Sequence, residues 1–270
     1  MVVQRHRWRV GAVAGLWAVM AGCAGGGASL EDHGAADPEE AVRRAADVLS
    51  SAGSARTRTA MEMAAGGTRL TIRGEGGYDF HSRMGELKVL LPPDPAGVDE
   101  HRPITELLTP GALYMKNRGA GVPADKWVRV DTTSLADGNL VTGGATDPLA
   151  AAELLRGARS VVYVGETELA GVRVRHYRGV TDISRAAVVA GEQTRGSLVA
   201  AAKGFTTDTV PFDAYLDERG RLCKVRHLFS YDNQGRTVAV ASTTLLYAFG
   251  SPVTVRLPEQ GDIYAGKIES

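Results

Sequence analysis

The sequence predicts an α+β fold in which a strongly curved antiparallel sheet of about ten strands, a half-barrel, wraps around about three helices. Most of the chain carries apolar residues at every second position, which is typical of strands, and only three segments have helical spacing. Strands dominate both ends of the chain and do not alternate with helices, which argues against a parallel doubly wound sheet. The composition, with 44% hydrophobic and 23% charged residues, is that of a globular protein.

Residues 1–22 predict a lipoprotein signal peptide. Basic residues between Arg5 and Arg9 precede a short apolar stretch, 10–20, and a membrane-spanning helix would need roughly 20 apolar residues. Two small residues then lead to Cys23, and this order resembles a bacterial lipobox. We therefore expect acyl chains on Cys23 to hold the mature protein at the extracytoplasmic face of the cell membrane. An ordinary secretory signal followed by a chance cysteine is the alternative.

The charge balance and the cysteine content narrow the choice of partners. The chain has 31 Lys and Arg against 31 Asp and Glu, so it lacks the basic surplus typical of proteins that bind nucleic acid. Of its two cysteines, Cys223 has no partner in the chain if Cys23 carries lipid. We expect no disulfide, and we interpret Cys223 as a small buried apolar side chain.

Residues 23–36 are rich in Gly, Ala and Ser and predict a flexible tether to a single domain, 37–270. The first helix of this domain begins at Asp37, a good N-cap, with Pro38 in its first turn, and it ends at Gly53.

Two further helices have similar signals. An Asp-Pro pair opens a short helix over 147–157, and Asp182 caps a longer one over about 183–203. Gly191 and Gly196 weaken the middle of this longer helix.

Period-two alternation predicts strands in the remaining segments. These are 68–80, 87–91, 112–117, 126–131, 159–168, 172–181, 209–217, 221–231 and 236–249. Turns at 170–171, 217–220 and 232–235 join neighbouring strands into hairpins. The Gly-Glu-Gly-Gly segment 74–77 lacks the following helix of a phosphate-binding loop, and we expect it to be a β-bulge or a bend.

No catalytic motif is present: the chain has no P-loop, no dinucleotide-binding glycine pattern and no nucleophile elbow. His176 and His227 lie inside strands without partners at metal-ligand spacing, so we interpret them as satisfied or solvent-facing. The densest group of hard-metal ligands, 99–101, is in a Pro-rich loop and is interpreted as a solvated charge run. We therefore expect no metal, no cofactor and no enzymatic activity.

The size of the apolar side chains suggests a binding function. The helices are rich in Ala, and the strands contain mostly Val, Leu and Ala with few large aromatic residues. Small side chains opposite a curved sheet can leave an apolar gap that suits an acyl chain. A fully packed core of small residues is the alternative.

Several short motifs resemble one family. They are the lipobox at Cys23, the segment Gly121–Asp131, Asp147-Pro148 with Leu154-Leu155, Gly171–Gly179, Pro211–Asp217 with Gly220–Leu222, and Tyr247–Val253. Their order and spacing resemble the actinobacterial LppX/LprAFG lipoproteins, which are similar in fold to the LolA/LolB lipoprotein carriers. The similarity covers most of residues 37–258.

This resemblance implies a half-barrel with a hydrophobic cavity between its sheet and its helices, and no catalytic residues. Family members are thought to carry lipids or lipoglycans across the cell envelope. We therefore expect a monomeric, membrane-anchored carrier or chaperone of such a ligand. From alternation alone, the candidate ligand-binding residues are Leu70, Ile72, Leu87, Val89, Val162, Val164, Phe212 and Leu216, which could equally be ordinary core.

Two other functions stay open at this stage. An envelope interaction or sensory module would have a closed core and would dock a partner protein. A hydrolase with a dispersed site is the third class. A carrier should show a continuous apolar cavity of several hundred Å³, a docking module a filled core and an exposed apolar patch, and an enzyme converging titratable groups in a cleft.

Overall fold

The computed structural model describes residues 37–65, 67–92, 102–118, 121–142, 146–233 and 236–266. All of them belong to one compact unit, residues 36–270. The predicted signal peptide, Cys23, the tether and the acidic segment 99–101 lie outside the described residues.

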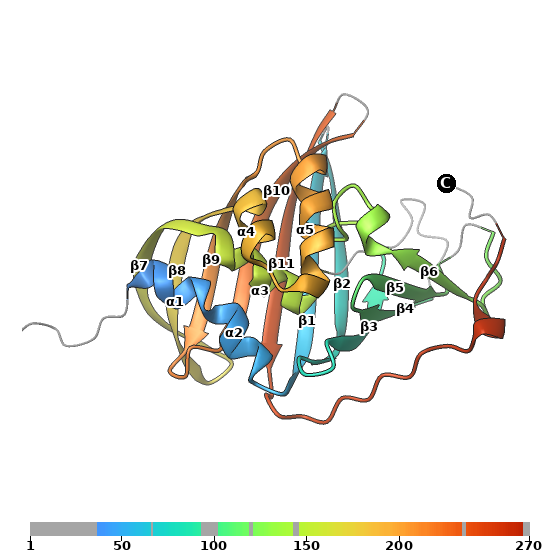
Figure 1. The fold of residues 1–270 in the computed structure, drawn as a ribbon, viewed down its shortest axis with the longest axis horizontal. Coiled ribbons are helices and arrows are strands. Elements are labelled where there is room, and N and C mark those ends of the chain that lie inside the picture. Colours follow the sequence, from blue (N-terminus) through green and yellow to red (C-terminus); the bar gives the residue numbers. More distant parts are fainter. Residues whose placement is uncertain are drawn as a thin grey trace, which may run out of the picture. The chain divides into compact units, whose positions relative to one another are not determined.

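One antiparallel sheet confirms the predicted fold class (Figure 1). Its eleven strands follow the order β6-β5-β4-β3-β2-β1-β11-β10-β9-β8-β7, so nearly all neighbours in the sheet are neighbours in sequence. The strands are β1 (Ser54–Ala65), β2 (Thr68–Asp79), β3 (Met84–Leu90), β4 (Ile104–Thr109), β5 (Ala112–Lys116), β6 (Trp127–Asp131), β7 (Ala158–Leu169), β8 (Val172–Asp182), β9 (Thr209–Asp217), β10 (Leu222–Asn233) and β11 (Arg236–Tyr247).

The three predicted helices are present, but two of them are split. They are α1 (Pro38–Arg43), α2 (Ala45–Ser50), α3 (Pro148–Leu154), α4 (Ile183–Val189) and α5 (Glu192–Gly204), with 3₁₀ turns η1 (Thr132–Ser134), η2 (Leu155–Gly157) and η3 (Gln260–Asp262). The N-caps match the predictions, since Asp37, Asp147 and Asp182 each accept a backbone N–H of their own first turn. Gly191 is the N-cap of α5, so the weakened middle of the third helix is a break.

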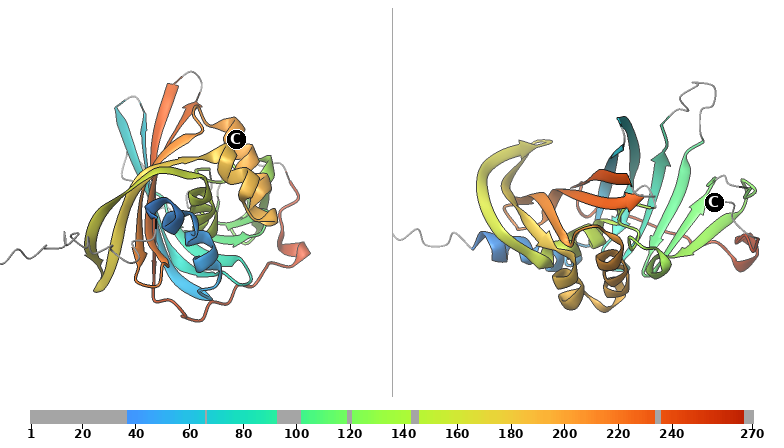
Figure 2. Two further views of the ribbon diagram at one scale, coloured as in Figure 1. Left: turned by 60° about the vertical axis from the view of Figure 1, so that its left-hand side comes forward. Right: turned by 90° about the horizontal axis from the view of Figure 1, so that it is seen from above.

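The helices lie on the concave side of the sheet (Figures 1 and 2). Helix α3 packs directly against β10 and β11, and α4 and α5 pack on α3. Helix α1 lies beside β7, at one edge of the sheet. Because α3 is buried along most of its length, it fills the centre of the half-barrel and forms the middle of the core.

Two strands were absent from the sequence-based prediction, β1 and β4. On β1, the side chains at 55, 57, 59 and 61 face the core, and two of them are Thr57 and Thr59. On β4, Glu106 takes a core-facing position between Ile104 and Leu108. Polar residues on the buried face interrupt the apolar alternation, which is why these strands were missed.

The glycine-rich segment 74–77 corrects another prediction. It does not form a bulge, because β2 pairs with β1 and with β3 in continuous register there. A Cβ atom on Gly76 would lie 1.9 Å from the Glu86 carbonyl oxygen of β3. The glycine therefore permits a close approach of two strands.

The hairpin turns agree with the prediction where the structure describes them. Ala170 and Gly171 connect β7 and β8 with positive φ angles of 49° and 82°. Asp217 closes the β9–β10 turn, since its carboxylate accepts the N–H groups of Arg219 and Arg221. In the β10–β11 turn, the two residues at 234–235 lie outside the described part.

The segment after β11 covers one edge of the sheet. It passes over the convex face, where Val253 lies against Gly77 of β2, and then reaches β6. There Ile263 forms a parallel bridge with Trp127, and the Tyr264 N–H donates to the Trp127 carbonyl at 2.8 Å. This contact satisfies part of an edge strand that would otherwise expose its backbone.

Candidate ligand site

The structure separates the predicted ligand-binding residues into two groups. Five of them are buried in the core: Ile72, Leu87, Val89, Phe212 and Leu216. The other three are exposed, with relative exposures of 37%, 56% and 50%: Leu70, Val162 and Val164. Leu70 lies near the start of β2, whereas Val162 and Val164 lie on the edge strand β7, so the structure does not bring the eight residues into one site.

A mainly apolar cavity, partly open to solvent, lies at the β5–β6 end of the concave face. It has a volume of about 180 Å³ and is lined by Leu113, Met115, Arg118, Val128, Val130, Leu135 and Thr142. Strands β5 and β6 supply one wall, and the segment after η1 supplies the other. The walls are mainly apolar, and the exposed side chain of Arg118 contributes a positive charge. This volume is below the 300–1,000 Å³ typical of ligand pockets.

Polar side chains occupy part of the concave face without partners. Within the described part of the chain, no hydrogen bond is formed by the hydroxyls of Thr57 and Thr59, by either carboxyl oxygen of Glu106, or by Nε2 of His227. All four residues are buried. Buried polar atoms normally find a partner, so this set of unsatisfied groups is unusual in a protein interior.

Burial sets the protonation of two of these groups. Desolvation raises the pKa of Glu106 to about 8, although Arg118 acts in the opposite direction. Desolvation also lowers the pKa of His227 to about 3. Both side chains are therefore uncharged at neutral pH, which avoids the larger cost of an unpaired buried charge.

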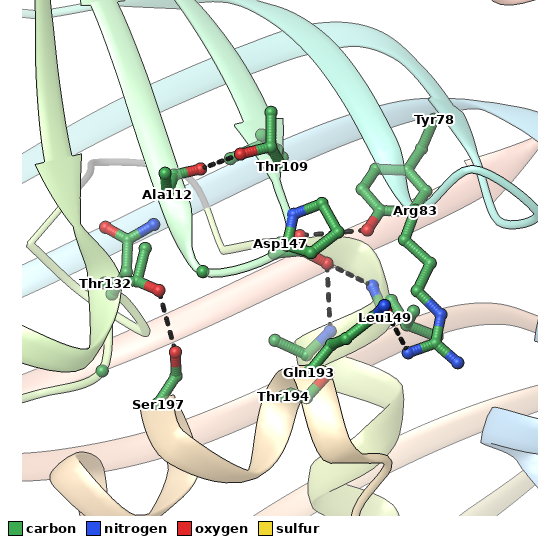
Figure 3. A pocket seen from close by; sticks show the side chains of 16 residues that line it. Tyr78, Arg83, Thr109, Ala112, Thr132, Asp147, Leu149, Gln193, Thr194 and Ser197 are labelled. Atoms are coloured by element: carbon green, nitrogen blue, oxygen red, sulfur yellow. Dashed lines mark hydrogen bonds between the residues drawn. The ribbon is translucent and has the colours of Figure 1, made fainter.

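A second, smaller pocket lies where the helices meet the sheet (Figure 3). Its volume is about 50 Å³, enough for water but not for a lipid chain. The Tyr78 hydroxyl donates to Asp147, whose carboxylate also caps α3 by accepting the N–H groups of Leu149 and Ala150. Burial raises the pKa of both Tyr78 and Asp147. This pocket joins β2 to α3 and has a structural role.

Two polar contacts attach α5 to the rest of the domain (Figure 3). The hydroxyls of Thr132 and Ser197 are 2.9 Å apart, and Arg83 donates to Gln193 at 2.7 Å. Only part of α5 faces the core, at Ser197, Leu198 and Ala201. The Thr132–Ser197 contact is buried, whereas the Arg83–Gln193 contact is exposed and contributes little stability.

A wide groove lies on the convex face, between β1–β3 and the segment after β11. Its volume is about 810 Å³, and its lining includes Arg56, Arg58, Arg73, Glu75, Glu86, Lys88 and Val253. Arg58 pairs with Glu75 at 3.1 Å. The groove is open to solvent and charged, so it does not suit a hydrocarbon chain.

His227 corrects the interpretation as a satisfied or solvent-facing histidine, because it is buried and its Nε2 has no partner among the described residues. His176 and Cys223 have structural contacts. His176 Nε2 lies 2.6 Å from Asp213 Oδ1, and its ring stacks on Tyr215 with 4.3 Å between centroids. Cys223 is buried as predicted, and desolvation raises the pKa of its thiol to about 11. The thiol is therefore protonated at neutral pH and unreactive.

Sequence reasoning named none of the residues that line the interior cavity, and it missed Glu106. One signal was available, because Glu106 shares the parity of Ile104 and Leu108 in a short run between prolines. An acidic residue among apolar residues on the buried face of a strand is unusual, and it indicates a candidate functional residue.

In the part of the chain that the structure describes, no helix combines the length and the apolar character needed to cross a membrane.

Comparisons with known proteins found solved structures that are similar to this chain. No protein-family model matches the chain, and no curated protein matches its sequence. The chain is similar to the lipoprotein LppX of Mycobacterium tuberculosis, with 12% identity and a TM-score of 0.47 over 81% of this chain and 98% of LppX. It is similar to LprF of Mycobacterium bovis, with 11% identity and a TM-score of 0.40 over 82% and 96% of the two chains. A LolA superfamily protein of Nitrosomonas europaea is similar at 10% identity, with a TM-score of 0.36 over 80% and 96% of the two chains.

Proposed function

We propose that this protein is an envelope lipoprotein that holds the hydrocarbon chain of a lipid between the concave face of its sheet and its helices. It acts by binding and release, and it breaks no bond. The observation that carries the proposal is the mainly apolar cavity of about 180 Å³ on the concave face, where other buried polar groups have no partner within the described residues. Burying hydrocarbon contributes about 0.8 kcal/mol per CH₂, so the apolar walls can supply the binding energy.

A complete acyl chain needs more room than this cavity offers. The space must grow by outward movement of α5 together with the segment after η1, which forms the outer wall. Part of the attachment of α5 is the exposed Arg83–Gln193 hydrogen bond, which contributes little stability.

Native mass spectrometry tests the binding function. The protein is prepared as residues 24–270, which retain the whole compact unit 36–270, and it is purified without detergent. A stoichiometric co-purifying lipid, identified after solvent extraction, is the expected result. A protein that is bare, and still bare after incubation with a total envelope lipid extract, would contradict the proposal.

A disulfide between the layers tests the opening movement. The double variant Thr132→Cys and Ser197→Cys replaces two hydroxyls that are 2.9 Å apart, close enough for a disulfide after small adjustments. We expect lipid uptake to be lost in the oxidised protein and restored by a reductant. The single variant Ser197→Cys, treated with the same oxidant, is the control. Unchanged uptake in the oxidised double variant would contradict opening at this layer.

The anchor is a separate part of the proposal. Cys23 carries the acyl chains in this reading, and the body of the protein stays at the extracytoplasmic face of the membrane. The support is the order of basic, apolar and small residues before Cys23. Cys23→Ala should move the protein from the membrane fraction to the soluble fraction or block its processing. A fully processed, membrane-bound Cys23→Ala protein would contradict lipidation at this residue.

A docking module is the second candidate, and the edge strand β7 favours it. Val162, Tyr163 and Val164 are exposed there, beside backbone groups that pair on one side only. An exposed apolar edge is a common site for adding another strand. The mass-spectrometric experiment separates the two functions, because a docking module stays bare in the presence of lipid.

A further inference from the structure

The convex face of the sheet carries a line of cations that runs across the strands. The strand register places in this line Lys224 of β10, Arg58 of β1, Lys88 of β3 and Lys116 of β5, with one strand between each cation and the next. The residue that precedes each of them is buried, so the cations lie on the opposite, convex face. Arg58 and Lys88 are exposed, and the two others are partly exposed.

Further cations flank this line on both sides. Arg226 and Arg73 share the next line in one direction along the strands. Arg56 and Arg129 share the next line in the other direction. From strand and residue spacings, the three lines cover roughly 30 Å across the strands and roughly 14 Å along them. We call this surface, defined by the eight cations, the basic face.

The carboxylates on these lines do not balance the cations. Between β10 and β6, the lines contain Glu75 and Glu86. Glu75 is engaged within the protein, since it pairs with Arg58 at 3.1 Å and accepts the Tyr247 hydroxyl at 3.1 Å. The basic face therefore has a positive surplus, although the whole chain has 31 basic and 31 acidic residues.

The groove on the convex face holds cations that are free to bind a ligand. Arg56, Arg73 and Lys88 line this groove and are exposed. None of them forms an ion pair with another residue in the described part of the chain. They come from β1, β2 and β3, near the middle of the sheet. The middle of a convex face reaches a flat surface first, so these cations would make the closest contact.

Aromatic rings lie beside half of these cations. The charged group is between 5.0 and 6.0 Å from the ring centroid in the pairs Arg58–Tyr247, Lys224–Tyr215, Lys116–Trp127 and Arg129–Tyr114. Tyr and Trp are enriched where a membrane meets water, because one end of each ring is apolar and the other is polar. The mixture of cations and such rings is suited to the headgroup layer of a membrane.

An acidic protein segment fits the basic face less well. An extended peptide would follow one line of cations, whereas the charges occupy three lines. A bilayer with anionic lipids presents negative charge over the whole area. Each Lys or Arg close to such a surface strengthens binding about fivefold. The breadth of the basic face therefore favours a membrane over a peptide.

We propose that the basic face docks on anionic lipid headgroups at the membrane surface. Headgroup phosphates would accept hydrogen bonds from Arg56, Arg73 and Lys88, and the helices on the concave side would face away from the membrane (Figure 2). This inference goes beyond the proposed function, because it involves neither the cavity nor the ligand. It adds a reversible contact to the proposed acyl anchor on Cys23.

Vesicle flotation tests the docking. The 24–270 protein, which lacks Cys23 and its acyl chains, is mixed with vesicles of phosphatidylglycerol and phosphatidylcholine in equal parts, or of phosphatidylcholine alone. We expect it to float with the anionic vesicles only, and to bind them less tightly as the salt concentration rises, because salt screens exposed charges. No binding to anionic vesicles at low salt, or equal binding to both kinds, would overturn the proposal.

A double variant tests whether the basic face is responsible. Arg73→Gln with Lys88→Gln removes two exposed cations, and affinity for anionic vesicles should fall at least about tenfold. Arg185→Gln with Lys203→Gln, at exposed positions of α4 and α5, removes the same charge and should bind as the parent protein. Unchanged affinity in the first double variant, or an equal loss in the second, would also overturn the proposal.

Polyglutamate tests the alternative of an acidic protein partner. A protein that binds polyglutamate but not anionic vesicles would assign the basic face to an acidic segment and refute membrane docking. The outcomes are independent of the proposed function. Lipid uptake by a protein that does not float with anionic vesicles would leave the carrier function standing and remove only the docking surface.

Discussion

Replacing Glu106 with glutamine should stabilise the protein in alkaline solution. Burial raises the pKa of Glu106 from 4.5 to about 8 in the folded state, whereas the unfolded chain keeps the ordinary value. The folded state therefore holds a proton that the unfolded state has already released. The free energy of unfolding consequently falls as the pH rises from about 4.5 to about 8, and it is fully reduced above that range.

The size of this effect follows from the two pKa values. At about 1.36 kcal/mol per pH unit, the difference between 4.5 and about 8 corresponds to a loss of about 5 kcal/mol when Glu106 is ionised. About 3 kcal/mol of this loss falls between roughly pH 5.5 and 8.5. A domain is commonly stable by 5–15 kcal/mol, so ionisation of one side chain removes a large part of its stability.

Urea unfolding, followed by far-UV circular dichroism at about pH 5.5, 7 and 8.5, measures the effect. The parent protein should lose about 3 kcal/mol more than Glu106→Gln across this range. Glu62→Gln, at an exposed position of β1, controls for the loss of one carboxylate and should follow the parent protein. Parallel pH profiles of the parent and Glu106→Gln would refute the reasoning, because they would show that Glu106 has an ordinary pKa in the folded state.

Three further predictions concern other parts of the fold. Burial lowers the pKa of His227 from 6.5 to about 3, so the free energy of unfolding should fall as the pH drops below 6.5. In urea unfolding between roughly pH 7 and 4, His227→Leu should lose about 3 kcal/mol less than the parent protein. Equal losses would contradict a buried neutral histidine. Gly76→Ala should lower the free energy of unfolding by more than about 2 kcal/mol, because its Cβ would lie 1.9 Å from the Glu86 carbonyl oxygen, whereas Gly261→Ala, with no atom within 4 Å, should change it by less than about 0.5 kcal/mol. Deleting residues 252–270 uncovers the edge of β6 with which Ile263 pairs. The shortened protein should therefore self-associate, as measured by size-exclusion chromatography with light scattering. A monomer of unchanged stability would show that this segment does not protect the edge of β6.

The alternation of apolar residues and the helix-capping residues were sufficient to predict most of the fold. The strand pattern predicted an antiparallel sheet, and the Asp-Pro pairs placed the first turns of α1 and α3 correctly. These signals are local: a strand that buries one face needs apolar residues at every second position, and a helix N-terminus needs a side-chain acceptor. Residues close in sequence therefore contain the necessary information.

The candidate site could not be predicted in the same way. The strands that sequence reasoning missed, β1 and β4, carry the buried Thr57, Thr59 and Glu106 on their concave face. These three polar residues interrupt the apolar alternation, so the strands were not predicted. The same residues carry buried polar atoms that have no hydrogen-bond partner among the described residues. In contrast, most of the predicted apolar ligand contacts, such as Phe212 and Leu216, lie buried in the core cluster.

The sequence by itself determined the class of fold, the helix starts and the predicted export and lipidation signal, because each depends on neighbouring residues. Only the tertiary structure decided which apolar residues are core and which line a cavity, since α3 fills the centre of the half-barrel and, among the described residues, the larger cavity on the concave face lies beside β5 and β6. It also decided the protonation of Glu106 and His227. A pKa depends on the desolvation imposed by packed neighbours, and those neighbours come from strands that are distant in the sequence.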